Sequence, residues 1–165
     1  MESKVDVEKL SVDELLSLYS QIIKSLKNRN VIRTKNFVGE IGEYLAIRYY
    51  NSTPNLPNLQ AAPVGTENID AISRAGKRYS IKTVTGKTTG VFYGLEPKGS
   101  DKEDEQKFEF IIVCVLNDEW ELSKIYEIDW MTFLKHKHWH SRMSAWNLSL
   151  SQGLISDATL IYSKE

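Results

Sequence analysis

Three residues have the chemistry and the spacing of a hydrolytic metal site: Glu43, Asp70 and Lys82. A hairpin turn near Gly76 would place Asp70 opposite about Ile81, within one residue of Lys82. Two carboxylates together with main-chain carbonyls form an oxygen-rich site that suits Mg²⁺. A lysine beside them can orient or deprotonate a water molecule and balance the charge of a phosphate. These groups suit phosphodiester hydrolysis, although an ordinary ion pair on a surface hairpin would use the same residue types.

The first half of the chain is expected to be helical. Ser11 and Glu14 form a capping box, and apolar residues then recur at helical spacing, which predicts a first helix over about residues 11–28. A second apolar stripe predicts a helix over about residues 36–50, with Glu43 at the edge of that stripe. Glu40 lies about 60° from Glu43 around this helix, so the two acids share one side.

After a proline-containing loop, the pattern changes to extended segments. The nearly continuous apolar run at residues 108–116 is typical of a strand that is covered on both faces. The four glycines and the charged run in residues 86–107 indicate a long loop. The remaining expected elements are strands at 68–74, 78–85 and 120–128, and a short helix at about 130–137. This order predicts an α/β fold on one central mixed sheet.

Composition narrows the class of protein. The chain has 165 residues, 41% hydrophobic and 26% charged, as expected for one globular domain over residues 1–165. We expect a helical part at 11–50, a sheet core at about 60–137 and a C-terminal extension at 138–165. The 21 basic and 22 acidic residues argue against a polybasic protein that binds nucleic acid through bulk charge.

The chain shows neither a signal peptide nor an apolar run that could cross a bilayer, so we expect a cytoplasmic protein without membrane contact. The single cysteine, Cys114, excludes an intramolecular disulfide and a cysteine-based zinc cluster, and it is expected to be buried in its strand. His136, His138 and His140 indicate a polar helix end rather than a zinc site.

Three segments resemble the PD-(D/E)XK nuclease superfamily: GEIGEYLA from Gly39, NIDAI from Asn68 and GKRYSIK from Gly76. That superfamily includes type II restriction endonucleases, Mrr-like nucleases and Holliday-junction resolvases. Its pattern is a helix with a metal-binding Glu, an Asp on the next strand, and an acid-X-Lys on the strand after it. The resemblance implies a restriction-endonuclease-like core, with a central mixed sheet of four or five strands flanked by helices and an extra N-terminal helix.

The resemblance also implies roles for individual residues. Glu43 corresponds to the helix Glu, Asp70 to the core metal ligand and Lys82 to the catalytic lysine, with the carbonyl of Ile81 as a further metal ligand. The expected cofactor is Mg²⁺, with Mn²⁺ as a substitute. The expected activity is that of an endodeoxyribonuclease, such as a type II restriction endonuclease.

Two positions depart from the family pattern. Ile69 stands where the superfamily has its proline, and Ser80 occupies the position of the second acid. A serine hydroxyl is a weak, neutral ligand, so we expect Ser80 to hold a metal-bound water and Glu40 to be a reserve acid. Mrr-like members with Gln at this position indicate that a neutral residue is compatible with activity. Two alternatives remain open: a catalytically degenerate module that binds nucleic acid or serves assembly, and a structure-specific, junction-type nuclease.

Basic residues near the proposed site are expected to contact DNA. Arg33, Lys35 and Lys87 could bind phosphates, although cations near a helix end also complement the helix dipole. A double-strand cutter of this size would need a homodimer to place two sites on two strands. No nucleotide cofactor is expected, because Ile81 stands where a P-loop ending at Thr85–Thr89 requires its first glycine.

Overall fold

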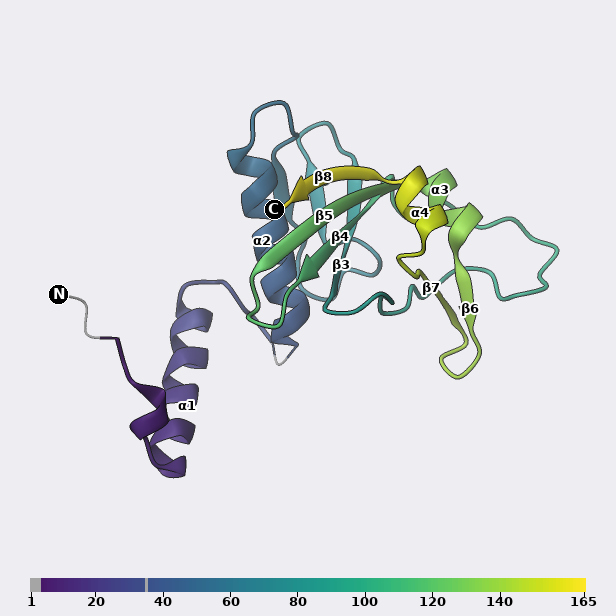
Figure 1. The fold of residues 1–165 in the computed structure, drawn as a ribbon. Helices are drawn as coiled ribbons and strands as arrows, with labels where there is room; N and C mark the ends of the chain where they lie inside the picture. Colours follow the sequence, from purple (N-terminus) through teal and green to yellow (C-terminus); the bar gives the residue numbers. More distant parts are fainter. Residues whose placement is uncertain (1–3, 35) are drawn as a thin grey trace.

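The computed structural model describes residues 4–34 and 36–165, which form an α/β arrangement around a mixed six-stranded sheet (Figure 1). The strand order is β1-β2-β3-β4-β5-β8, and β3 and β4 are parallel whereas the other neighbours are antiparallel. The strands are β1 (Leu59–Ala61), β2 (Ala71–Ser73), β3 (Arg78–Val84), β4 (Phe110–Leu116), β5 (Leu122–Asp129) and β8 (Thr159–Ser163). The expected α/β class is confirmed, and the sheet is larger than the four or five strands expected.

The other described elements are four helices, one short 3-10 turn and a separate hairpin. They are the 3-10 turn η1 (Val7–Lys9), α1 (Val12–Asn28), α2 (Phe37–Ser52), α3 (Trp130–His136), α4 (Gln152–Asp157), and the hairpin strands β6 (His138–His140) and β7 (Ala145–Asn147). Figure 1 shows α1 standing away from the sheet and α2 lying along it. None of the described helices is both long and apolar enough to cross a membrane.

The predicted cap of the first helix is confirmed. The Glu14 carboxylate accepts a hydrogen bond from the Ser11 backbone N–H at 2.8 Å, and the Glu14 N–H donates to Ser11 Oγ at 3.3 Å. These reciprocal bonds satisfy two backbone donors that would otherwise lack partners at the start of α1.

The core lies on both faces of the sheet, and β4 contributes to each. Ile112 and Cys114 join the cluster beneath α2, where Tyr50 is fully buried. Ile111 and Val113 face the opposite cluster, which contains five large aromatic residues. These are Phe92, Phe108, Tyr126, Trp130 and Phe133. The continuous apolar run at 108–116 is therefore a strand covered on both faces, as predicted, and Cys114 is buried within it.

α2 approaches β3 very closely at Gly42. A Cβ atom built on Gly42 would lie 1.7 Å from Oγ1 of Thr83, so only glycine fits at this point of the helix. The close approach fixes the position of the next residue, Glu43, relative to β3.

Candidate active site

Asp70 lies directly before β2, at the point where this strand begins to pair with β3. Its N–H donates to the carbonyl of Tyr79 at 2.8 Å, and its Oδ2 accepts from the N–H of Ile81 at 2.6 Å. The prediction that Asp70 faces about Ile81 is therefore confirmed. Burial raises the pKa of Asp70, while the Ile81 N–H and the charge of Lys82 partly oppose this shift.

Glu43 comes from α2 and lines the same small cavity as Asp70, with a volume of about 120 Å³. Burial raises the pKa of Glu43 to about 7, and the negative charge of Asp70 adds to the shift. Arg33 partly offsets it, since its Nη2 lies 3.7 Å from Oε2 of Glu43. A carboxyl whose pKa is raised this far is unusual on a protein surface and is more typical of functional sites.

Lys82 projects from β3 toward the start of the 86–107 loop. Its Nζ donates to the carbonyl of Val91 at 3.1 Å and lies 4.6 Å from the ring centroid of Phe92. Burial lowers the pKa of Lys82, and the charges of Asp70 and Glu43 act in the opposite direction. The fold thus brings the three predicted residues within electrostatic reach of one another, from α2, from the start of β2 and from β3.

Ser80 is buried, with 1% of its surface exposed, and its Oγ makes no hydrogen bond within the described chain. The hydroxyl lies near enough to Asp70 to help lower the pKa of that carboxyl, but without the geometry of a formed hydrogen bond. A buried hydroxyl without a partner is unfavourable. The expectation that Ser80 holds a metal-bound water stays a prediction, since the structure shows only a buried hydroxyl without a protein partner.

Glu40 has different surroundings from those of Glu43. Its Oε1 accepts from the backbone N–H of Thr34 at 2.9 Å, and its Oε2 accepts from the N–H of Arg33. Although burial disfavours the charged form, these bonds hold the pKa of Glu40 below its usual value. Glu40 therefore anchors the connection between α1 and α2, and it would have to give up these bonds to act as the predicted reserve acid.

The three basic residues expected to contact DNA differ in position. Arg33 lines the cavity beside Glu43, and its Nη1 donates to the carbonyl of Ala62 at 3.4 Å. Lys87 is exposed in the 86–107 loop, and Lys35 lies outside the described residues. Of the two that the structure describes, Arg33 lies beside the carboxylates and Lys87 does not line their cavity.

The candidate metal ligands at the cavity are the carboxylate oxygens of Glu43 and Asp70, which suit Mg²⁺ better than zinc. The carbonyl of Ile81 points to the same side of β3 as its N–H, which donates to Asp70, because both groups of a strand residue face one neighbour. Within residues 4–34 and 36–165, no cluster of three or more His, Cys, Asp or Glu could hold a metal. A cation here would depend on two carboxylates, the Ile81 carbonyl and water.

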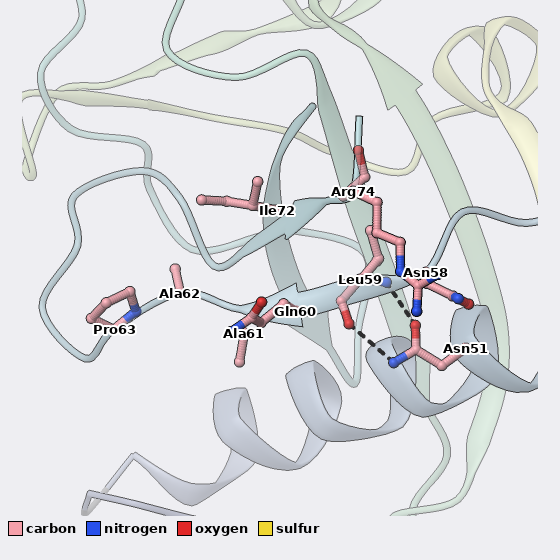
Figure 2. A pocket seen from close by; sticks show the side chains of 10 residues that line it. Asn51, Asn58, Leu59, Gln60, Ala61, Ala62, Pro63, Ile72 and Arg74 are labelled. Carbon is pink, nitrogen blue, oxygen red and sulfur yellow. Dashed lines mark hydrogen bonds between the residues drawn. The ribbon is translucent and has the colours of Figure 1, made fainter. Parts of the chain in front are cut away.

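A larger pocket, about 540 Å³, lies at the outer edge of the sheet and contains none of the predicted site residues (Figure 2). The Asn51 side chain fixes β1 there, since its Oδ1 accepts from the N–H of Leu59 at 2.6 Å and its Nδ2 donates to the Leu59 carbonyl at 3.0 Å. The other polar side chains that line it are Asn58, Gln60, Ser73 and Arg74. No sequence signal pointed to this pocket, because the three-residue strand β1 lies in a segment expected to be a loop.

The three histidines His136, His138 and His140 lie on two different elements. His136 contacts Asp157 at 2.6 Å, whereas His138 and His140 lie on β6.

Comparison with protein-family models and with curated proteins finds no match to this chain.

Proposed function

We propose that this protein is a metal-dependent endodeoxyribonuclease built on a restriction-endonuclease-like core. The observation that carries the proposal is the convergence of Glu43, Asp70 and Lys82, which come from three elements and meet in a partly buried site. The shifted pKa values of all three groups are typical of catalytic sites, where burial and neighbouring charges are used to adjust reactivity. The parallel pairing of β3 with β4, and α2 packed across them, are compatible with this core.

In the proposed mechanism, Asp70, Glu43 and the carbonyl of Ile81 hold Mg²⁺. The bound ion would polarise the scissile phosphate and lower the pKa of a water molecule. Lys82 orients the attacking water and, because burial lowers its pKa, can also accept a proton from it. As the oxygen of that water bonds to phosphorus, the bond from phosphorus to the leaving oxygen breaks, and the leaving oxygen keeps the bonding pair and takes a proton from solvent.

Two further residues would position the reactants. Arg33 lines the cavity, and its guanidinium could bind a phosphate of the DNA backbone there. The free hydroxyl of Ser80 would bind a water molecule beside Asp70. Lys87 would contact a phosphate of the DNA backbone. A homodimer would place two sites on the two strands of the duplex.

Incubation of the pure protein with supercoiled plasmid, in Mg²⁺, in Mn²⁺ and in EDTA, tests the proposal. We expect metal-dependent nicks or discrete fragments, and a loss of more than about 100-fold in rate for Asp70→Asn and for Lys82→Met. Lys77→Met and Asp101→Asn are matched controls, because both side chains are exposed and lie outside the site. Equal cleavage by Lys82→Met and wild type would refute the assignment of the lysine.

One observation favours a second candidate function. Ser80 leaves the site with two carboxylates, which is compatible with a module that binds nucleic acid without cutting it. Such a module would shift DNA in a gel whether or not metal is present, and Mg²⁺ would not stabilise it. A substrate panel of linear duplex and four-way junctions would separate a sequence-reading nuclease from a junction-type nuclease.

A further inference from the structure

The helix α1 has an apolar face that is largely exposed in the described chain. None of its residues is buried. The large apolar side chains on this face are well exposed: Val12 72%, Leu15 40%, Leu16 63%, Tyr19 53% and Ile22 48%. An isolated helix of 17 residues is only marginally stable in water, so the helix gains most from burial of this face against a partner.

The apolar positions follow the spacing of a two-helix seam. Successive intervals of three, four, three and four residues separate the members of what we call the α1 seam: Val12, Leu15, Tyr19, Ile22 and Leu26. This is the heptad pattern that packs one helix against another, with seam residues seated between side chains of the facing helix. Leu16 and Ile23 border the seam and widen its apolar surface.

The α1 helix is held away from its own core. Ile32, a few residues after the helix, is 1% exposed and anchors the connection to the core. The Glu40 carboxylate accepts the backbone N–H groups of Arg33 and Thr34 and fixes the chain just beyond. Figure 1 shows α1 standing apart from the sheet.

The charges near the two ends of α1 favour an antiparallel partner over a parallel one. Asp13 and Glu14 lie in the first turn, while Lys24 and Lys27 lie toward the other end. Two antiparallel copies place the acidic end of each helix beside the basic end of the other, and their helix dipoles also oppose. A parallel pair would place like charges together.

We propose that α1 pairs antiparallel with α1 of a second copy of this chain, around a two-fold axis. In this register Tyr19 faces Ile22 of the partner helix and Leu15 faces its Leu26, while Glu14 lies level with its Lys27. Each contact then occurs twice, as a two-fold interface requires. The interface does not depend on the proposed nuclease activity, and its tests measure association rather than cleavage.

Sedimentation equilibrium of the full chain tests the seam. We expect a dimer for the wild type and at least a tenfold weaker association for Ile22→Glu, since this substitution places a charge in the seam. Ser17→Glu is the matched control, because Ser17 lies on the opposite face of the same helix, and it should remain a dimer. Circular dichroism and thermal unfolding check that the core of Ile22→Glu is intact. A monomeric wild type, or an equally tight Ile22→Glu dimer, overturns the proposal.

Disulfide cross-linking tests the direction. When Leu15→Cys and Leu26→Cys chains are mixed under a mild oxidant, antiparallel pairing joins one variant to the other. Neither variant should cross-link alone. Cross-linking of each variant with itself would instead show parallel pairing and would refute the proposed register. The native Cys114 is buried and should not react.

Discussion

At the scale of single residues, Glu43 is the candidate site carboxyl whose pKa moves into the neutral range. Its carboxyl shares a small cavity with Asp70, and burial together with that charge raises its pKa to about 7. Ionisation of Glu43 at neutral pH therefore destabilises the folded protein, and a bound cation would offset this free-energy cost. Glu40, three residues earlier, shows the opposite behaviour, because two backbone N–H groups stabilise its charge.

The raised pKa of Glu43 predicts how stability depends on pH. The protonated form is favoured in the folded state, so its contribution is complete below pH 4.5 and is lost as the pH rises through about 7. Glu43→Gln cannot ionise and should lack this loss. At pH 8 without divalent cations we expect Glu43→Gln to be more stable than wild type by about 1–2 kcal/mol.

Urea unfolding at pH 5 and at pH 8 measures this difference. The gain of Glu43→Gln over wild type should appear at pH 8 and shrink at pH 5. Glu103→Gln, which replaces an exposed carboxylate in the 86–107 loop, is the control and should show no such pH-dependent gain. A Glu43→Gln variant that is less stable than wild type at pH 8 would contradict the electrostatic argument.

If Asp70 is a metal ligand, the thermal stability of the protein should depend on Mg²⁺. Mg²⁺ should raise the unfolding temperature of the wild type at pH 8, because a ligand that binds only the folded state stabilises it. A concentration tenfold above the dissociation constant corresponds to about 1.4 kcal/mol, or roughly 3–6 °C in a chain of this size. Asp70→Asn should abolish the shift and Asp101→Asn should keep it, as measured by scanning calorimetry. An equal shift for Asp70→Asn would place the metal elsewhere.

At the scale of elements, the contact between α2 and β3 sets the geometry of the site. Gly42 has no room for a side chain against Thr83, so Gly42→Ala must push the helix away from the strand. We expect a loss of about 1–3 kcal/mol in the free energy of unfolding. The displaced helix carries Glu43, so any cleavage activity should fall as well.

Gly39→Ala is the matched control on the same helix. A Cβ at Gly39 would approach only the end of the Asn36 side chain, at 3.0 Å, and that side chain can rotate away. Alanine also favours helix by about 1 kcal/mol over glycine, so Gly39→Ala should be neutral or stabilising in urea unfolding. Equal destabilisation by the two substitutions would show that the Thr83 contact is not the cause.

The sequence predicted those elements whose signals are local. The capping box placed the start of α1, and the apolar run placed β4, since both depend on neighbouring residues in the chain. The predicted strand at 68–74 is shorter, Ala71–Ser73, because Asn68 has a left-handed backbone with φ of 59°. The strands β1 and β8 were missed, because they form by pairing with distant partners rather than by a pattern of their own.

The site shows the same division. Asp70 and Lys82 could be placed from one hairpin, because strand pairing fixes which residues lie opposite. The different surroundings of Glu43 and Glu40 could not be predicted. They depend on where the chain at Arg33 and Thr34 returns to α2, and spacing along the helix does not carry that information.

At the scale of the whole molecule, the charge balance limits how the proposed DNA substrate could be bound. The formal net charge is −1, so affinity must come from a local group of cations and not from the field of the whole protein. Two copies of the chain would double that local group and would present two candidate sites to the two strands of a duplex. The α1 pairing and the proposed nuclease activity therefore lead to a joint prediction.

A dimer with one site per chain should cut both strands of a plasmid in one encounter, whereas a monomer should cut one strand at a time. With supercoiled plasmid in Mg²⁺, we expect wild type and Ser17→Glu to produce linear DNA early. Ile22→Glu should accumulate nicked circles, because its seam is disrupted while its site, on α2 and β3, is unchanged. Gel densitometry over time measures the ratio of nicked to linear DNA. Early linear product from an Ile22→Glu variant that is monomeric in sedimentation would show that one chain cuts both strands, and the link between pairing and double-strand cleavage would fail.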